Sequence, residues 1–208
     1  MNKVDESKVN PWTPKFTLEY RGVYHFGVSE MESDLILIFS LDKIYGQIRS
    51  ALWTGEIWVS KFENLENIKI VGNKFYSSKS NGEFVLYDNG KEKIKGLKIY
   101  KTWSDIPSGP GQYEIGVKQN TLEYLHQGKF NQASLRLLDK EELEKMTKAD
   151  LKIMRNEIYA RYHLKFTAGG QMETYFKKEG WYRGHYDNVD NFLTGLEKEN
   201  IRLIKGHL

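Results

Sequence analysis

The sequence predicts an α+β protein of two domains, an antiparallel β domain followed by a small all-α domain. Short runs rich in β-branched and aromatic residues, separated by tight-turn signals, fill residues 20–102. The densest cluster of proline and glycine follows at residues 104–111 and indicates a boundary. From residue 134 onward, apolar residues recur with helical spacing. We therefore expect a β domain over 15–104, a linker with one short helix over 105–133, and a helical domain over 134–208.

Composition excludes several classes of function. The 208 residues include no cysteine, which excludes disulfides, thiol catalysis and Cys-ligated zinc. The net charge is only +3, without the clustered Lys and Arg that a nucleic-acid interface needs. No segment approaches the ~20 apolar residues of a transmembrane helix, so we expect none.

The β domain begins with three recognisable strands. Residues 34–39 form a short apolar run, and residues 43–53 and 56–62 are rich in β-branched and aromatic side chains. Asn81-Gly82 and Asn89-Gly90 favour tight hairpin turns, because both central positions of a type I′ turn need positive φ. About eight strands fit between Tyr20 and Lys101, enough to close a small barrel with a lipocalin-like outline.

The interior of such a barrel has two possible uses. It is either filled by side chains or holds one small hydrophobic ligand. The candidate pocket residues are the aromatic side chains Trp53, Trp58 and Tyr87. The sequence leaves both uses open. The alternation of apolar and polar residues along a strand shows which side chains share a face, but the strand register is needed to tell which face points inward.

The helical domain shows capping signals at each expected helix start. A Ser, Thr or Asp before a helix accepts a hydrogen bond from a free backbone N–H, and an acidic residue in the first turn favours the positive end of the helix dipole. Such pairs are Asp139 with Glu142, Thr147 with Asp150, and Thr194 with Glu197. A further short helix is expected over residues 170–178.

The helix that begins after Thr147 carries an unusual mixture of polar side chains. Its apolar stripe is Leu151, Met154, Ile158 and Tyr162. Residues 155–166 read Arg-Asn-Glu-Ile-Tyr-Ala-Arg-Tyr-His-Leu-Lys-Phe, and the later segments 175–176, 181–182 and 196–201 read Tyr-Phe, Trp-Tyr and Leu-Glu-Lys-Glu-Asn-Ile.

In that order, these segments resemble the YARHG domain, a small helical module of bacterial envelope and secreted proteins. The resemblance covers roughly residues 134–208 and implies no reaction, because the family has none established. It implies a periplasmic, outer-membrane-attached or secreted protein, such as a lipoprotein, with a signal segment ahead of residue 1. A native start at Met1 would instead predict a cytoplasmic protein.

The motif that names the family is altered in this chain. Tyr-Ala-Arg-His-Gly appears as Tyr159-Ala160-Arg161-Tyr162-His163. A role that depends on the family's histidine therefore does not transfer to Tyr162. Glycine at the last position suits the left-handed conformation that ends a helix, which histidine tolerates less well.

Two interpretations fit the polar residues of this helix. Arg155, Asn156, Glu157, Tyr159 and Arg161 supply guanidinium forks and an aromatic face for an anion or a carbohydrate. Alternatively they form a structural network inside the domain, because buried polar groups are usually satisfied within the fold.

The pair Trp181-Tyr182 also has two interpretations. It is either a sugar-stacking platform or the aromatic core of a small domain that needs bulky side chains to bury enough surface. Residues 30–34 cluster three carboxylates, which suits a solvated loop better than a Ca²⁺ or acid/base site. The five histidines form no metal pattern, and we expect neither a metal nor a cofactor.

We therefore expect a non-enzymatic envelope or secreted protein whose helical module contacts a cell-wall glycan such as peptidoglycan, or a surface glycan. The alternative is a β-barrel carrier of a small hydrophobic ligand. A hydrolase has the least support, since no nucleophile and base stand at a recognisable spacing.

Overall fold

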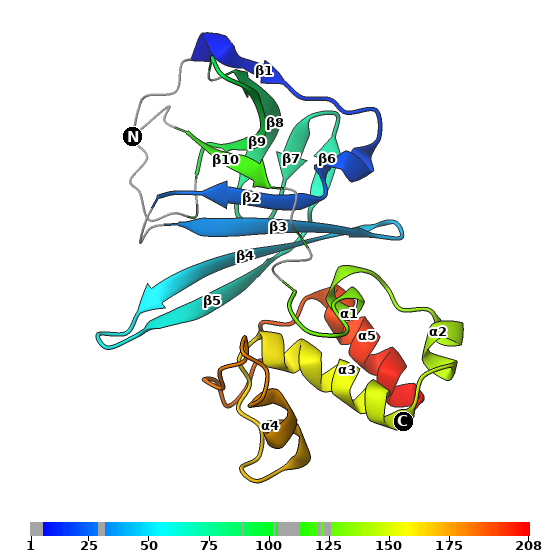
Figure 1. Cartoon of the computed structure of the whole chain (residues 1–208). Helices are drawn as coiled ribbons and strands as arrows, with labels where there is room; N and C mark the ends of the chain where they lie inside the picture. The colour runs from blue at the N-terminus through cyan, green and yellow to red at the C-terminus, as the bar shows by residue number, and fades with distance from the viewer. Residues whose placement is uncertain are drawn as a thin grey trace. The chain divides into compact units, whose positions relative to one another are not determined.

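The computed structural model describes residues 6–28, 32–88, 90–101, 103, 113–119, 122 and 126–208 (Figure 1). The chain divides into two compact units. Met1–Ile38 and Ile44–Thr121 form the sheet unit, and Phe39–Lys43 and Leu122–Leu208 form the helical unit. The predicted helix near residues 119–128 and the proline-glycine cluster at 104–111 lie largely outside the described residues.

The sheet unit contains a single antiparallel sheet. The strands follow the order β5-β4-β3-β2-β10-β9-β8-β7-β6, and β1 pairs with β8 from outside this order. The described strands are β1 Val9–Pro11, β2 Gly22–Phe26, β3 Ser33–Ser40, β4 Lys43–Trp53, β5 Trp58–Leu65, β6 Lys69–Val71, β7 Lys74–Tyr76, β8 Asn81–Asp88, β9 Lys93–Ile99 and β10 Glu114–Gln119. Two 3-10 helices, Glu6–Lys8 and Thr17–Tyr20, lie on either side of β1.

The sheet is open, which corrects the expected closed barrel. Its order ends at β5 on one side and at β6 on the other. Strand β5 has eight residues, whereas β6 and its neighbour β7 have three each. Strand β6 is therefore too short to form backbone hydrogen bonds along the whole of β5, as closure of the sheet would need. The edge of β8 that faces away from β9 is shared between β7 and β1. Strand number was predictable from the sequence, but closure also depends on these strand lengths.

The turn expected at Asn81-Gly82 is also wrong, because both residues begin β8. A Cβ atom added at Gly82 would lie 2.3 Å from the backbone oxygen of Lys98 on the neighbouring strand. The glycine therefore permits close approach of β9 rather than a turn. Asn89 of the second predicted turn lies outside the described residues.

Aromatic side chains fill the core of the sheet unit. The rings of Tyr20 and Phe84 stack at 3.9 Å, and Trp12 meets Tyr20 edge-on. The Tyr24 hydroxyl donates to the backbone oxygen of Tyr20 at 2.7 Å. Burial raises the pKa of Tyr20 to about 12 and raises the pKa of Tyr24 as well. These rings form a buried aromatic cluster of the sheet unit.

The helical unit follows the predicted capping residues closely. Its helices are α1 Gln132–Leu135, α2 Lys140–Glu144, α3 Lys148–Arg161, α4 Gln171–Phe176 and α5 Gly195–Gly206. The Thr147 side chain caps α3, and Thr194 with Glu197 forms a complete capping box at α5. Asp139 caps α2 by accepting from the backbone of Glu141. Leu151, Met154 and Ile158 of α3 are fully buried, and α3 packs against α1 and α5.

We expect Gly116→Ala to destabilise the sheet unit. A Cβ atom there would lie 2.4 Å from the ring of Phe26, which is fully buried. Overpacking of this kind costs about 1–3 kcal/mol. Urea unfolding followed by tryptophan fluorescence measures the effect. The neighbouring Val117→Ala, at an exposed position, is the control, and equal stability of the two variants would contradict the prediction.

Candidate functional site

Glu157 and Arg161 form a buried ion pair in α3. The two residues are four positions apart, and their relative exposures are 1% and 7%. The Glu157 carboxylate also accepts the backbone N–H groups of Lys129 at 2.9 Å and Phe130 at 2.7 Å. This carboxylate therefore attaches the chain that leads into α1 to the middle of α3.

Arg161 extends the network toward α5. Its Nε donates to the backbone oxygen of Gln127 at 2.8 Å, and its Nη1 donates to the Ser134 hydroxyl at 3.0 Å. Ser134 in turn donates to Glu197 at 2.6 Å, and the Tyr162 hydroxyl donates to the other oxygen of Glu197 at 2.7 Å. One chain of polar contacts therefore links α1, α3 and α5.

Burial governs the electrostatics of this network. Burial raises the pKa of Glu157, whereas the Arg161 guanidinium and the backbone donors of Phe130 and Lys129 oppose that shift. Gly128 lies directly against the carboxylate, because a Cβ atom there would be 2.3 Å from the Glu157 carboxyl carbon. The φ angle of Gly128 is +112°, so the position requires glycine for its conformation as well.

Asn200 of α5 makes a second structural contact that the sequence reading missed. Its side chain accepts from the backbone N–H of Leu138 at 2.9 Å and donates to the backbone oxygens of Ala133 and Arg136 at 2.8 Å each. A buried asparagine inside an amphipathic helix is the signal that points to such a role.

The five polar residues predicted on α3 do not form one surface. Glu157 and Arg161 meet in the interior, where their polar atoms form hydrogen bonds with other groups of the protein. Asn156 donates to the backbone oxygen of Lys152 in its own helix. Arg155 and Tyr159 are half-buried.

His163 ends the helix in the conformation that the family's glycine would adopt. Its φ angle is +63°, and its Nδ1 lies 3.1 Å from the backbone oxygen of Arg183. Its own backbone oxygen accepts from His185 at 2.7 Å and from Tyr186 at 2.9 Å. These bonds hold the segment after α3 beside the segment around Tyr186.

A pocket of about 300 Å³ lies at this junction. Its walls come from the segment after α3, from α4 and the residue after it, and from the segment after the aromatic pair. The lining residues are Lys165, Phe166, Glu173, Lys177, Tyr182, Arg183 and Gly184. The Tyr182 hydroxyl donates to the backbone oxygen of Leu164 at 2.6 Å, which fixes the ring in the wall.

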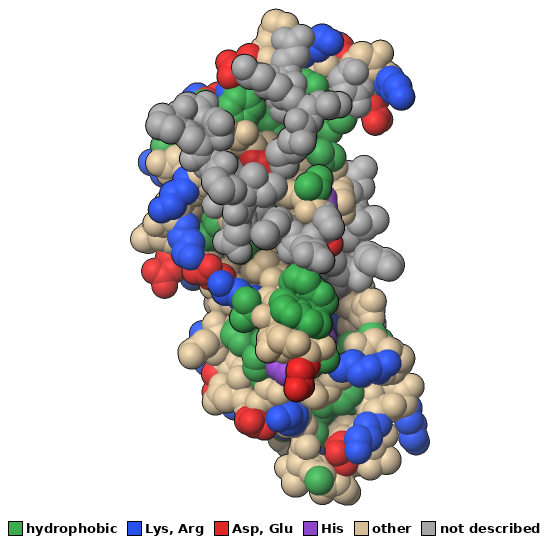
Figure 2. Space-filling model, turned by 90° about the vertical axis from the view of Figure 1, so that its left-hand side faces the viewer, with side chains coloured by type: hydrophobic (Ala, Val, Ile, Leu, Met, Phe, Trp, Pro, Cys, Tyr) green, Lys and Arg blue, Asp and Glu red, His purple; other side chains and the backbone are tan. Residues whose placement is uncertain are grey.

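Cationic side chains dominate the rim of this pocket. Lys177 pairs with Glu173 at 2.8 Å, and Lys165 lies 3.2 Å from Asp187. Arg183 is exposed. Figure 2 shows Lys and Arg side chains interspersed with acidic and apolar ones at the height that α4 has in Figure 1. The pocket thus combines aromatic walls with hydrogen-bond donors of positive charge.

The predicted pair Trp181-Tyr182 is divided between two positions. Tyr182 lines the pocket, whereas Trp181 does not line it. Trp181 packs edge-on against Phe176, whose fully buried ring is the centre of an aromatic cluster with Phe166 and Tyr182. Two members of the cluster, Phe166 and Tyr182, also line the pocket.

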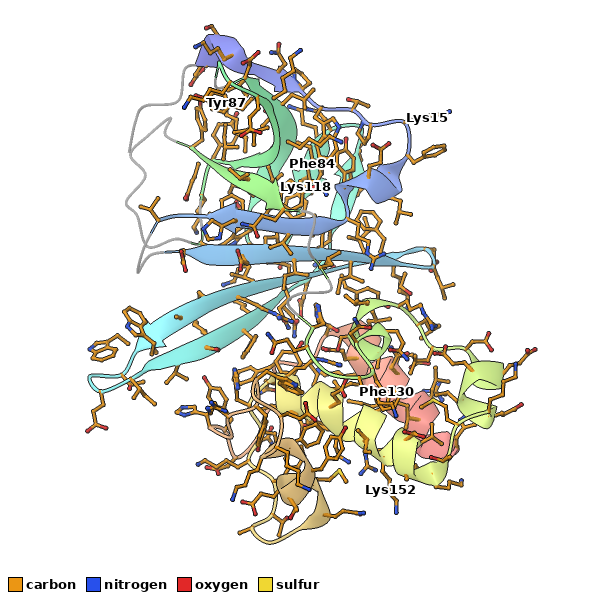
Figure 3. The ribbon with its side chains drawn as sticks, in the orientation of Figure 1. Lys15, Phe84, Tyr87, Lys118, Phe130 and Lys152 are labelled. Atoms are coloured by element: carbon orange, nitrogen blue, oxygen red, sulfur yellow. The ribbon has the colours of Figure 1, made fainter. Side chains whose placement is uncertain are left out.

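The aromatic residues expected inside a barrel do not line a common interior. Trp53 and Trp58 face each other at the end of the β4–β5 hairpin, with relative exposures of 50% and 47%. Tyr87 lies partly buried on β8, between Val9 of β1 and Ile94 of β9 (Figure 3). The hairpin position of the tryptophans could not be read from the sequence without the register.

The last features to place are a metal site, the acidic cluster at residues 30–34 and a membrane-spanning helix. In the part of the chain that the structure describes, no group of three His, Asp or Glu side chains is placed to hold a metal ion. Asp34 contacts the Nδ1 of His25 at 2.8 Å, and Glu30 of the acidic cluster lies outside the described residues. No helix among the described residues is long and apolar enough to span a membrane.

Residues 128–207 match the family model of the YARHG domain. The match confirms the resemblance seen in the sequence and begins at the glycine that contacts Glu157. No curated protein and no solved structure matches the chain significantly.

We expect Glu157→Ala to destabilise the helical unit far more than Arg155→Ala. Removing the carboxylate leaves the Arg161 guanidinium buried without its counter-ion, which costs about 3–5 kcal/mol. Arg155 is half-buried on the same helix, and its truncation should cost less than about 1 kcal/mol. Urea unfolding followed by circular dichroism at a helical wavelength compares the two. Similar losses in both variants would show that the buried pair has no special role.

We expect His163→Gly to be more stable than His163→Ala. Both variants lose the contact with the Arg183 backbone, but only glycine relieves the left-handed conformation, which costs other residues about 1–2 kcal/mol. The difference between their free energies of unfolding isolates this backbone strain. An alanine variant as stable as the glycine variant would refute it.

Proposed function

We propose that the helical unit is a glycan-binding module of a bacterial envelope or secreted protein, and that the pocket around Tyr182 is its site. The observation that carries this proposal is the pocket itself. It places the aromatic side chains of Phe166 and Tyr182 beside the charged donors of Lys165 and Arg183. Sugars present both apolar C–H faces and hydroxyl groups, so aromatic walls and hydrogen-bond donors suit them.

The match to the YARHG family supports an envelope or secreted location, as that family's occurrence implies. In this proposal the protein acts in the periplasm, on the outer membrane or outside the cell. Peptidoglycan is the glycan that such a module would meet first. The proposed role needs no catalytic step.

The proposal assigns the polar contacts to different residues from those first expected. Glu157 and Arg161 direct their polar atoms to protein partners, so they support the domain that carries the pocket. Lys165 and Arg183, on the segments that follow α3 and Tyr182, supply the contacts instead. The carrier hypothesis has less support, because the sheet is open and does not close into a barrel.

Binding is tested with the whole chain and soluble peptidoglycan fragments. Fragments released from sacculi are titrated into isotopically labelled protein, and amide shifts are followed by NMR. We expect saturable shifts at Phe166, Lys177 and Gly184, which line the pocket. The amide of Lys152 on α3 serves as an internal control (Figure 3). Absence of saturable shifts, or shifts confined to residues outside the pocket, would overturn the proposal.

A further inference from the structure

We infer that the glycan bound in this pocket is anionic and is recognised through a carboxylate or phosphate group by Arg183 and Lys165. This inference rests on the proposed glycan-binding function and adds the chemical class of the ligand. The basis for it is a comparison of the charged groups around the pocket. Some of them already have close partners, and others remain available to a ligand.

The charges that line the pocket do not cancel. Three cationic side chains face one carboxylate, because Glu173 is the only acidic residue of the lining. Glu173 forms an ion pair with Lys177 at 2.8 Å and also accepts the backbone N–H of Gly169 at 2.7 Å. The hydrogen bond from Lys177 lowers the pKa of Glu173, so this carboxylate stays ionised and paired. Lys165 and Arg183 have no acidic partner among the lining residues.

Arg183 is positioned but not saturated. Its Nη1 donates to the backbone oxygen of Tyr182 at 2.7 Å, and its own backbone oxygen contacts His163. Among the described residues, its Nε and Nη2 have no hydrogen-bond partner. A guanidinium with a free edge matches the two oxygens of a carboxylate or phosphate in a bidentate arrangement. The backbone contacts reduce the freedom that such a side chain would lose on binding.

Lys165 has only a loose partner. Asp187 lies 3.2 Å away, but its side chain is 87% exposed. Exposed pairs of this kind contribute little and are readily exchanged for another anion. Gly184 packs closely against this wall of the pocket, since a Cβ atom there would lie 2.8 Å from the Tyr182 hydroxyl. An anion next to the aromatic wall therefore meets two cations, and the carboxylate of the lining, Glu173, is already paired with Lys177.

Carboxylates and phosphates occur on different glycans, and the experiment separates them. Calorimetry with the whole chain compares four probes: peptidoglycan fragments with free carboxylates, the same fragments after amidation, a glycerol-phosphate polymer, and neutral chitotetraose. We expect free carboxylates or phosphates to bind at least about tenfold more tightly than amidated or neutral probes, with affinity falling as salt rises. The tighter of the two anionic probes identifies the source of the negative charge.

The variants Arg183→Gln and Lys165→Gln locate the effect. Each should weaken binding of the preferred anionic probe several-fold and leave the weak binding of chitotetraose unchanged. Lys152→Gln, an exposed lysine on α3 that removes the same charge, should leave both unchanged. Melting temperatures of all variants report whether the fold is retained.

The possible failures are distinguishable. Equal affinity for free and amidated fragments, with NMR shifts still at the pocket, would overturn the anionic inference and leave the glycan function standing. An equal loss of affinity in the Lys152→Gln variant would show that net charge, rather than the pocket, causes the preference, and would also overturn the inference. Absence of pocket shifts with every probe would overturn both.

Discussion

The helical unit depends on the buried ion pair between Glu157 and Arg161. Removing two charges from water costs several kcal/mol per ion, and the pair is tolerated only because further hydrogen bonds satisfy both groups. Those bonds come from the backbone of residues 127–130 and from Ser134. The buried pair of α3 needs these hydrogen bonds, and this need fixes the position of the chain that leads into α1. Together with the buried apolar side chains, this polar centre specifies how the short helices meet.

The same centre determines where the pocket lies. Arg161 is the last residue of α3, and Tyr162 directly after it donates to Glu197 of α5. The helix end is thereby held in place, and His163 turns the chain with a positive φ. The residues that follow can then pair with Tyr186 through the bridge at Leu164. The buried network thus fixes the positions of the two segments that form walls of the pocket.

Local signals were readable from the sequence, and distant ones were not. Thr147 and Thr194 predicted their helix starts because a cap depends on residues three positions away. The pairing of Glu157 with Arg161 followed from helical spacing, but their burial depends on backbone groups 27 and 34 positions away. Barrel closure failed as a prediction for the same reason. Closure depends on the lengths of β5 and β6, and these two strands stand at opposite ends of the strand order.

Density of polar residues in a sequence is a poor guide to where a ligand binds. A side chain binds a ligand through donors that the fold leaves unoccupied. Arg161 uses its Nε and both terminal nitrogens within the protein, so it has little left to offer. Arg183 uses one nitrogen, and it lies after Tyr182, outside α3. Arg161 and Arg183 therefore differ in what they can offer: Arg161 holds the domain together, and Arg183 is the one that keeps donors for the proposed anion.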